Sequence, residues 1–149
     1  MAAIETDAFL PHEPSKVWRA LTDPRLLERW LMPNDFLPQI GRRFTFQTEP
    51  RLDYGFDGIV HCEVLALDLD RLLAISWRTS AGLDTTVTWK LAAEGRGTRL
   101  FLTHDGFDET DPFSRQVMEI LGGGWRGHLK SRLDAVLADI DPADQAELG

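Results

Sequence analysis

The sequence has 149 residues, of which 43% are hydrophobic and 27% are charged, a length and mixture typical of one globular domain. The net charge of −8 argues against nucleic acid or an anionic membrane as a main partner, because both attract basic protein surfaces. One cysteine, Cys62, excludes an internal disulfide framework and a zinc site built from cysteines.

The chain begins with patterns typical of a strand and two short helices. Apolar and polar residues alternate over residues 3–9 and predict a strand. After Pro14, apolar residues at helical spacing predict a short helix. Asp23 is a suitable N-cap and Pro24 a suitable first residue for a second short helix, which Pro33 ends.

The middle of the chain changes to the period of two that is typical of strands. One face of the third predicted strand holds Val60, Cys62, Val64 and Ala66, with Leu67 on the opposite face. Short turns between successive strands predict an antiparallel meander. The strands are expected at residues 44–46, 60–67, 73–77, 86–91 and 99–104, with a loop at 49–58 and turns at 68–71 and 94–97.

The last element is predicted to be a long helix that begins with Asp111 as N-cap and Pro112 as its first residue. An apolar row at a spacing of four residues, from Phe113 to Leu137, predicts a face turned to the core. The run 122–124 consists of glycines, each of which costs about 1 kcal/mol relative to alanine in a helix. Space for a cavity, close approach of an aromatic ring or a kink would each explain it.

These elements predict an α+β fold in which a curved antiparallel sheet of about six strands wraps around the long C-terminal helix. Two short helices follow the first strand, and a pocket is expected between sheet and helix. Residues 1–138 are expected to form a single domain. Residues 139–149 are expected to form an acidic, flexible tail, because few apolar residues remain there and Pro142 discourages a helix.

An ordered set of residues resembles a known family along nearly the whole chain. The matches are Pro14, Val17, Trp18, Ala20, Leu21, Thr22, Asp23, Pro24, Leu27, Trp30, Gly41, Phe44, Gly58, Trp77, Thr98, Leu100, His104, Gly106, Phe107, Gly124 and Trp125. Together they resemble the heat-shock-protein-90 ATPase activator-like family of the START-like (SRPBCC, polyketide cyclase and Bet v-like) superfamily. The resemblance implies a helix-grip fold and a cavity for an apolar small molecule. The sequence departs from the family pattern at Arg42, where a second glycine is usual.

No motif predicts a catalytic set. The four histidines lack the spacing of metal ligands, and neither a nucleophile elbow nor a phosphate loop is present. Cys62 is expected to be a small buried residue rather than a reactive thiol. The sequence therefore predicts no catalytic residue, no metal site and no cofactor. No apolar run approaches about 18 residues and no signal-peptide pattern is seen, so we expect a cytoplasmic protein.

Aromatic residues from every predicted layer are candidates to line the cavity, although an aromatic cluster is also typical of a plain core. His104 and His128 are the leading polar candidates, and hydrogen-bonded core or surface histidines are the alternatives. The candidate ligand-binding residues are Trp30, Phe44, Phe46, Trp77, Trp89, His104, Phe107, Leu121, Gly124, Trp125 and His128.

Three functions fit the sequence. We favour non-enzymatic binding of a hydrophobic small molecule, lipid-like, polyketide-like or aromatic, in the internal cavity. A second hypothesis is a polyketide cyclase-like or hydratase-like enzyme in which His104 or His128 acts as acid or base. A third is a protein-interaction module resembling the co-chaperone, with a chaperone partner. A homodimer is compatible with all three, whereas nucleic acid and membrane partners are not expected.

Overall fold

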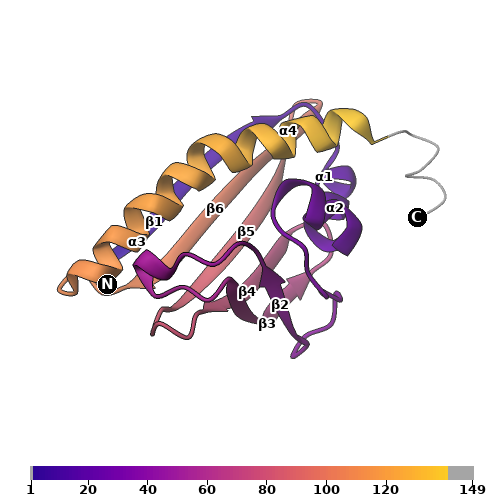
Figure 1. The fold of residues 1–149 in the computed structure, drawn as a ribbon. Helices are drawn as coiled ribbons and strands as arrows, with labels where there is room; N and C mark the ends of the chain where they lie inside the picture. Colours follow the sequence, from indigo (N-terminus) through magenta and orange to yellow (C-terminus); the bar gives the residue numbers. More distant parts are fainter. Residues whose placement is uncertain (1, 141–149) are drawn as a thin grey trace.

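The computed structural model, which describes residues 2–140, contains one six-stranded antiparallel sheet with the strand order β1-β6-β5-β4-β3-β2 (Figure 1). Each pair of neighbouring strands is antiparallel. Short connections require this between successive strands, whereas β1 pairs with β6, the last strand in the sequence. The predicted sheet is therefore confirmed. The strands are β1 (Ala2–Leu10), β2 (Arg43–Gln47), β3 (Ile59–Asp68), β4 (Leu72–Arg78), β5 (Asp84–Glu94) and β6 (Gly97–Phe107).

The helices begin where the sequence predicts them. The Asp23 carboxylate accepts a hydrogen bond from the Arg25 backbone N–H at 2.9 Å, and Asp111 accepts one from Phe113 at 3.2 Å. Both aspartates thus cap helices that continue with proline. The helical elements are α1 (Pro14–Thr22), α2 (Pro24–Trp30), the 3₁₀ turn η1 (Leu52–Tyr54), α3 (Pro112–Gly123), the π-helical turn η2 (Gly124–His128) and α4 (Leu129–Asp139).

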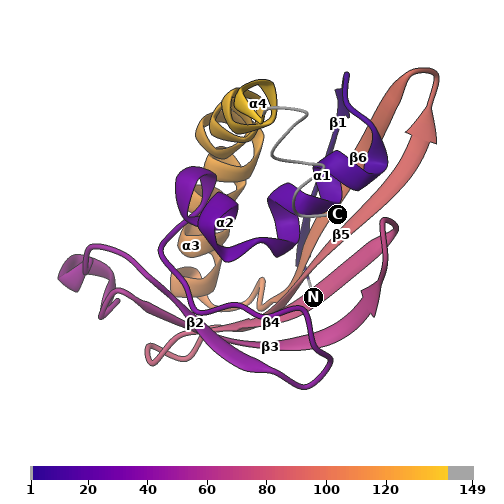
Figure 2. The same cartoon turned by 90° about the vertical axis from the view of Figure 1, so that its right-hand side faces the viewer.

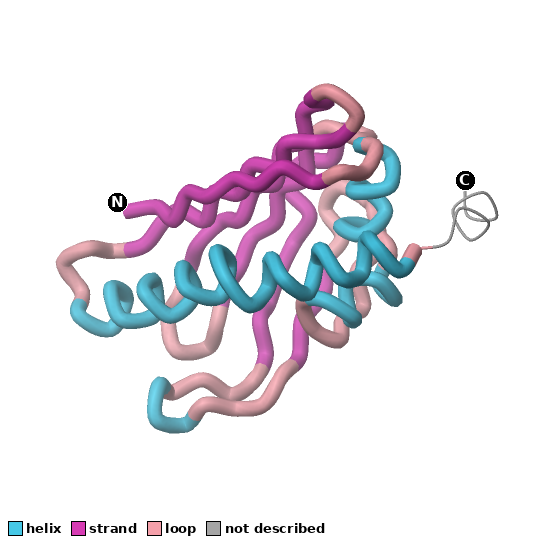
Figure 3. The backbone as a smooth tube through the Cα atoms, turned by 90° about the horizontal axis from the view of Figure 1, so that it is seen from above, coloured by secondary structure: helices cyan, strands magenta, loops and turns pink. Residues whose placement is uncertain are grey.

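The core lies between the inner face of the curved sheet and the helices. Figure 2 shows the sheet bending around the long helix, with α1 and α2 on the same side, and Figure 3 shows α3, η2 and α4 as one continuous rod along the sheet. Helices α1 and α2 contact α4, and α1 also contacts β5 and β6. This arrangement is the predicted helix-grip. Its largest fully buried side chains include Trp30, Trp89, Phe36, Phe46, Phe107 and Leu137.

The sequence prediction is wrong at one end of β3. Val60, Cys62 and Val64 are buried as expected, but the register with β4 shifts between Val64 and Ala66. Ala66 then pairs with Ala74 on the outer face, and Leu67 pairs with the buried Leu73 and packs against the core. A β-bulge inserts one residue and so reverses the alternation beyond it, which strict period-two reasoning does not anticipate.

The glycine run leads into the π-helical turn of the long helix: Gly122 and Gly123 end α3, and Gly124 begins η2. Gly122 is buried, and a side chain there would lie 3.8 Å from Ile4 of β1 and 3.2 Å from the Arg126 guanidinium. A side chain at Gly123 would meet no other atom within 4 Å. The π turn carries Trp125, which is buried in the core. The glycines therefore accompany a local change of helix geometry, a feature frequent at functional sites.

Replacing Gly123 with alanine is expected to raise the free energy of unfolding by up to about 1 kcal/mol, because it removes the helix cost of glycine without creating a contact. Urea denaturation measures this change. Gly122→Ala is the matched comparison and should gain less or lose stability, since its methyl group crowds Arg126. A loss in the Gly123 variant would show that the π turn itself requires glycine there.

The end of the chain is described only to residue 140. Ile140 is buried and Asp139 forms an ion pair with Arg29 of α2, so the first two residues of the predicted tail pack against the domain. Residues 141–149 lie outside the described part. Within residues 2–140, none of the helices has the length and apolar character needed to cross a membrane.

Candidate functional site

A small internal cavity of about 50 Å³ lies between the sheet and the C-terminal helix. Strands β1, β5 and β6 form one wall, and α2, η2 and α4 form the other. Asp7 and Lys130 are exposed side chains, so the cavity reaches the surface between the free edge of β1 and α4. It is lined by Thr6, Asp7, Ala8, Leu10, Trp30, Trp89, Leu100, Leu102, Trp125, Lys130 and Leu133.

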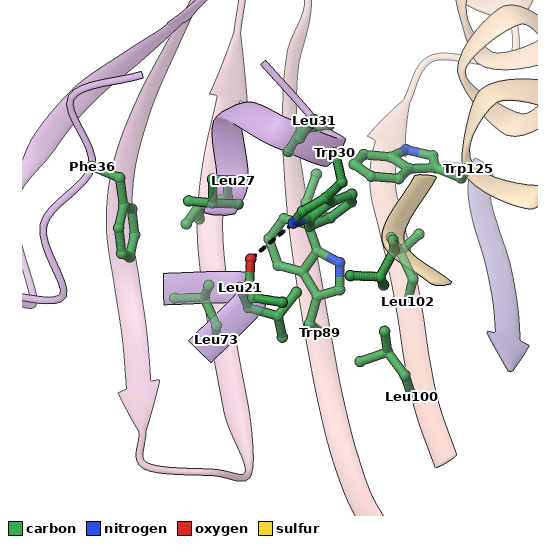
Figure 4. Close-up of a cluster of buried hydrophobic side chains, with 14 of the residues drawn as sticks. Leu21, Leu27, Trp30, Leu31, Phe36, Leu73, Trp89, Leu100, Leu102 and Trp125 are labelled. Atoms are coloured by element: carbon green, nitrogen blue, oxygen red, sulfur yellow. Dashed lines mark hydrogen bonds between the residues drawn. The ribbon is translucent and has the colours of Figure 1, made fainter. Parts of the chain in front are cut away.

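Three tryptophans from three different elements meet at this cavity. Trp30 comes from α2, Trp89 from β5 and Trp125 from the π turn (Figure 4). The rings of Trp89 and Trp125 are nearly perpendicular, with centroids 5.9 Å apart, which is a favourable edge-to-face geometry. The Trp30 Nε1–H donates to the Ala20 carbonyl oxygen at 2.8 Å and fixes that ring against α1.

His104 lies next to the cavity in a fully buried hydrogen-bond chain. The Trp125 Nε1–H donates to His104 Nδ1 at 3.1 Å, and His104 Nε2 lies 2.7 Å from Thr85 Oγ1. The Thr85 hydroxyl donates to the Trp77 carbonyl oxygen at 2.9 Å. The chain therefore connects the π turn through β6 and β5 to β4.

The hydrogen-bond donors around His104 determine which of its ring nitrogens carries the proton. Indole N–H groups only donate, so Nδ1 must be the unprotonated acceptor and Nε2 must carry the proton that it donates to Thr85. Burial lowers the pKa of His104 to about 3, because the charged imidazolium would be desolvated. A neutral histidine with both nitrogens engaged is a structural group. This arrangement gives no support to His104 as an acid or base.

The Cys62 thiol and the potential metal-ligating side chains give no sign of chemical activity either. Burial and the nearby Asp35 carboxylate raise the pKa of the Cys62 thiol, which makes it a poor nucleophile. Within residues 2–140, no group of three or more His, Cys, Asp and Glu side chains is placed to hold a metal ion.

A larger hollow of about 450 Å³ lies on the outer face of β2, β3 and β4. It is wide open and its lining is mainly polar and charged: Asp35, Arg43, Phe44, Thr45, His61, Cys62, Glu63, Ser76 and Arg78. Binding sites for small molecules are concave and mostly apolar. The internal cavity therefore fits an apolar ligand better, although its volume is smaller.

The structure places the predicted site residues in three groups. Trp30, Trp89 and Trp125 line the cavity. Leu121 and Gly124 are half-buried on the long helix, and the side chain of His128 lies outside the described part of the structure. The remaining candidates are buried in the core but are not among the residues that line this cavity: Phe44, Phe46, Trp77, His104 and Phe107.

Most lining residues absent from the predicted set carry a signal in the sequence. Leu100 and Leu102 alternate with outward residues on β6, and Leu133 belongs to the apolar row of the long helix. Thr85, the partner of His104, lies on the same face of β5 as Val87 and Trp89. The exposed residues Asp7 and Lys130 have no such signal, because only the fold brings β1 and α4 together.

Solved structures with this architecture are found in several bacteria. Protein MLL2253 from Mesorhizobium loti is 32% identical, with a TM-score of 0.83, covering 94% of this chain and 99% of that chain. CalU16 from Micromonospora echinospora is 25% identical, with a TM-score of 0.73, covering 97% of this chain and 82% of that one. The Aha1 dimer from Colwellia psychrerythraea shares the fold, with 20% identity, a TM-score of 0.70 and coverage of 91% and 96%.

No curated protein matches the sequence. The family model described as Activator of Hsp90 ATPase homolog 1-like protein matches residues 11–138, a range that includes all strands except β1 and all helices except the last residue of α4. The helix-grip structure and the resemblance of its sequence motifs agree with this match. The chain therefore belongs to the Activator of Hsp90 ATPase homolog 1-like family.

Proposed function

We propose that this protein binds a hydrophobic small molecule, without chemical conversion, in the cavity between the sheet and the C-terminal helix. The observation that supports this most directly is the lining: three tryptophans and four leucines surround a space that reaches the surface beside β1. Such a lining excludes water from a ligand and stabilises it through apolar contact.

The cavity volume limits what fits without movement. Pockets for drug-sized ligands usually measure about 300–1,000 Å³, against about 50 Å³ here. A molecule the size of one aromatic ring therefore requires α4 to move away from β1. The π turn beside Trp125 is a natural point for that movement, because helices commonly bend at such turns.

The alternatives have less support. The hydrogen-bonded, neutral state of His104 argues against the cyclase-like hypothesis for that residue. A homodimer is a further proposal. It is supported by Phe9 and Phe101, which are 44% and 43% exposed on the outer face of β1 and β6, and by the dimer described for the Colwellia protein. Sedimentation velocity tests it by giving the mass in solution.

The proposed site is tested by filling it. Ala8→Leu adds three carbon atoms to the cavity wall on β1, whereas Ala92→Leu adds the same atoms to the exposed outer face of β5. We expect the unmodified protein and the Ala92 variant to bind compounds such as acetophenone, 2-naphthol or decanol. The Ala8 variant should bind them at least about tenfold more weakly, a difference of about 1.4 kcal/mol.

Quenching of tryptophan fluorescence provides the readout, since Trp30, Trp89 and Trp125 line the cavity. Thermal unfolding of each variant shows whether it remains folded. Equal affinity of the Ala8 and Ala92 variants would place the ligand elsewhere. Absence of binding across the whole panel would contradict the proposed function.

A further inference from the structure

The three indole N–H groups around the cavity are not equivalent. Those of Trp30 and Trp125 donate to the Ala20 carbonyl oxygen and to His104 Nδ1. The Trp89 Nε1–H has no hydrogen-bond acceptor among the described residues, although Trp89 is only 2% exposed. This nitrogen is not among the fully buried side-chain atoms that lack a partner, so it keeps a small accessible surface within an otherwise buried residue.

The Trp89 nitrogen lies beside another residue that lines the cavity. Figure 4 shows the Trp89 nitrogen on the side of its ring toward Leu102, which is its direct partner across the β5–β6 pair. Leu102 lines the cavity together with Trp89 and Trp125. An acceptor atom placed in the cavity can thus reach the indole hydrogen.

The charged groups at the mouth already have partners. Lys130 Nζ lies 2.9 Å from an Asp134 carboxylate oxygen, and Asp7 lies 2.9 Å from the Arg99 guanidinium. The deeper lining is apolar, and Thr6 is half-buried. The cavity therefore presents no unpaired charge to a ligand, which favours a neutral molecule.

We infer that the cavity is built for a neutral, mostly apolar molecule with one acceptor oxygen, such as a ketone, which accepts the hydrogen bond of Trp89 Nε1–H. This inference rests on the proposed function and adds the chemical class of the ligand and the residue that orients it. Trp30 and Trp125 then supply apolar surface only, because their N–H groups are occupied within the protein.

Acetophenone and α-methylstyrene form a matched pair of probes, because they share a shape and differ in having C=O or C=CH₂. We expect the unmodified protein to bind acetophenone about fivefold to tenfold more tightly, the range of one net hydrogen bond. Trp89→Phe keeps an aromatic ring but removes the donor. It should lose the preference for acetophenone or reverse it, because the ketone then gives up its hydrogen bonds with water without replacement. Trp18→Phe, which alters a tryptophan away from the cavity, should keep the preference.

The Trp89 indole resonance in a ¹H–¹⁵N spectrum, identified by its loss in Trp89→Phe, gives a second readout. It should move downfield with acetophenone and not with α-methylstyrene. Equal affinity of the unmodified protein for both probes would overturn the inference while leaving the proposed function intact; a retained water molecule or a contact of the N–H with the Trp125 ring would give that result. Binding of neither probe would contradict both proposals.

Discussion

Replacing His104 with alanine should lower the free energy of unfolding by roughly 3–5 kcal/mol. The substitution removes a fully buried ring and leaves a cavity beside Trp77, whose ring centroid lies 5.5 Å away. It also leaves the Trp125 N–H without its acceptor and Thr85 without its donor, and each unpaired buried group adds to the cost. Urea denaturation followed by tryptophan fluorescence measures the change.

Two further variants separate the contributions. His61→Ala removes an exposed histidine from β3 and should change stability by no more than about 0.5 kcal/mol. His104→Gln offers an amide oxygen to Trp125 and an amide N–H to Thr85, so it should lose less than the alanine variant. A loss below about 1 kcal/mol in His104→Ala would mean that the hydrogen-bond chain contributes little.

Stability should fall as the pH is lowered from 7.5 to 4.5, by about 2.5 kcal/mol from His104 alone. Its pKa is about 3 in the folded protein, against about 6.5 in the unfolded chain. Between these values the unfolded chain binds more protons, so acid favours unfolding, and the stability is fully present only above the unfolded pKa. Urea denaturation at a series of pH values measures this dependence.

Between pH 7.5 and 4.5, the change in the free energy of unfolding comes mainly from histidines and not from carboxylates. Hydrogen bonds lower the pKa of Asp53 and Asp108 in the folded protein. Their contribution to stability is therefore lost mainly as the pH falls through the unfolded value of about 3.9, below that window. Burial and Lys16 lower the pKa of His12, so it contributes in the same direction as His104. His104→Gln should lose most of the pH dependence, whereas His12→Asn should keep most of it. The reverse result would assign the dependence to His12.

Local chemistry explains why the sequence predicts most of the fold. Asp23 and Asp111 satisfy free backbone donors at helix starts, and this depends only on neighbouring residues. Alternation places Val87, Trp89, Leu100 and Leu102 inward because one face of the sheet covers the core. The bulge after Val64 is not readable in this way, since an inserted residue changes the pairing of two strands together.

The cavity is harder to predict, because its position depends on how well distant side chains fill space. Phe44 packs edge to face on Phe46, and the Phe46 ring is tilted against Trp77. None of these three rings lines the cavity, whereas Trp30, Trp89 and Trp125 do. Both groups have the same aromatic signal in the sequence. His104 likewise looks like a ligand contact until Thr85 and Trp125 are seen to occupy both of its nitrogens.

Trp125 contributes both to the cavity wall and to the stability of the core, and ligand binding can favour one role at the expense of the other. It forms part of the cavity wall and is tied to the interior by its hydrogen bond to His104. A guest large enough to push this ring aside must break that bond, so part of its binding energy is spent on loosening the fold. Variants with a more spacious and receptive cavity should therefore be less resistant to heat, which is the usual conflict between activity and stability.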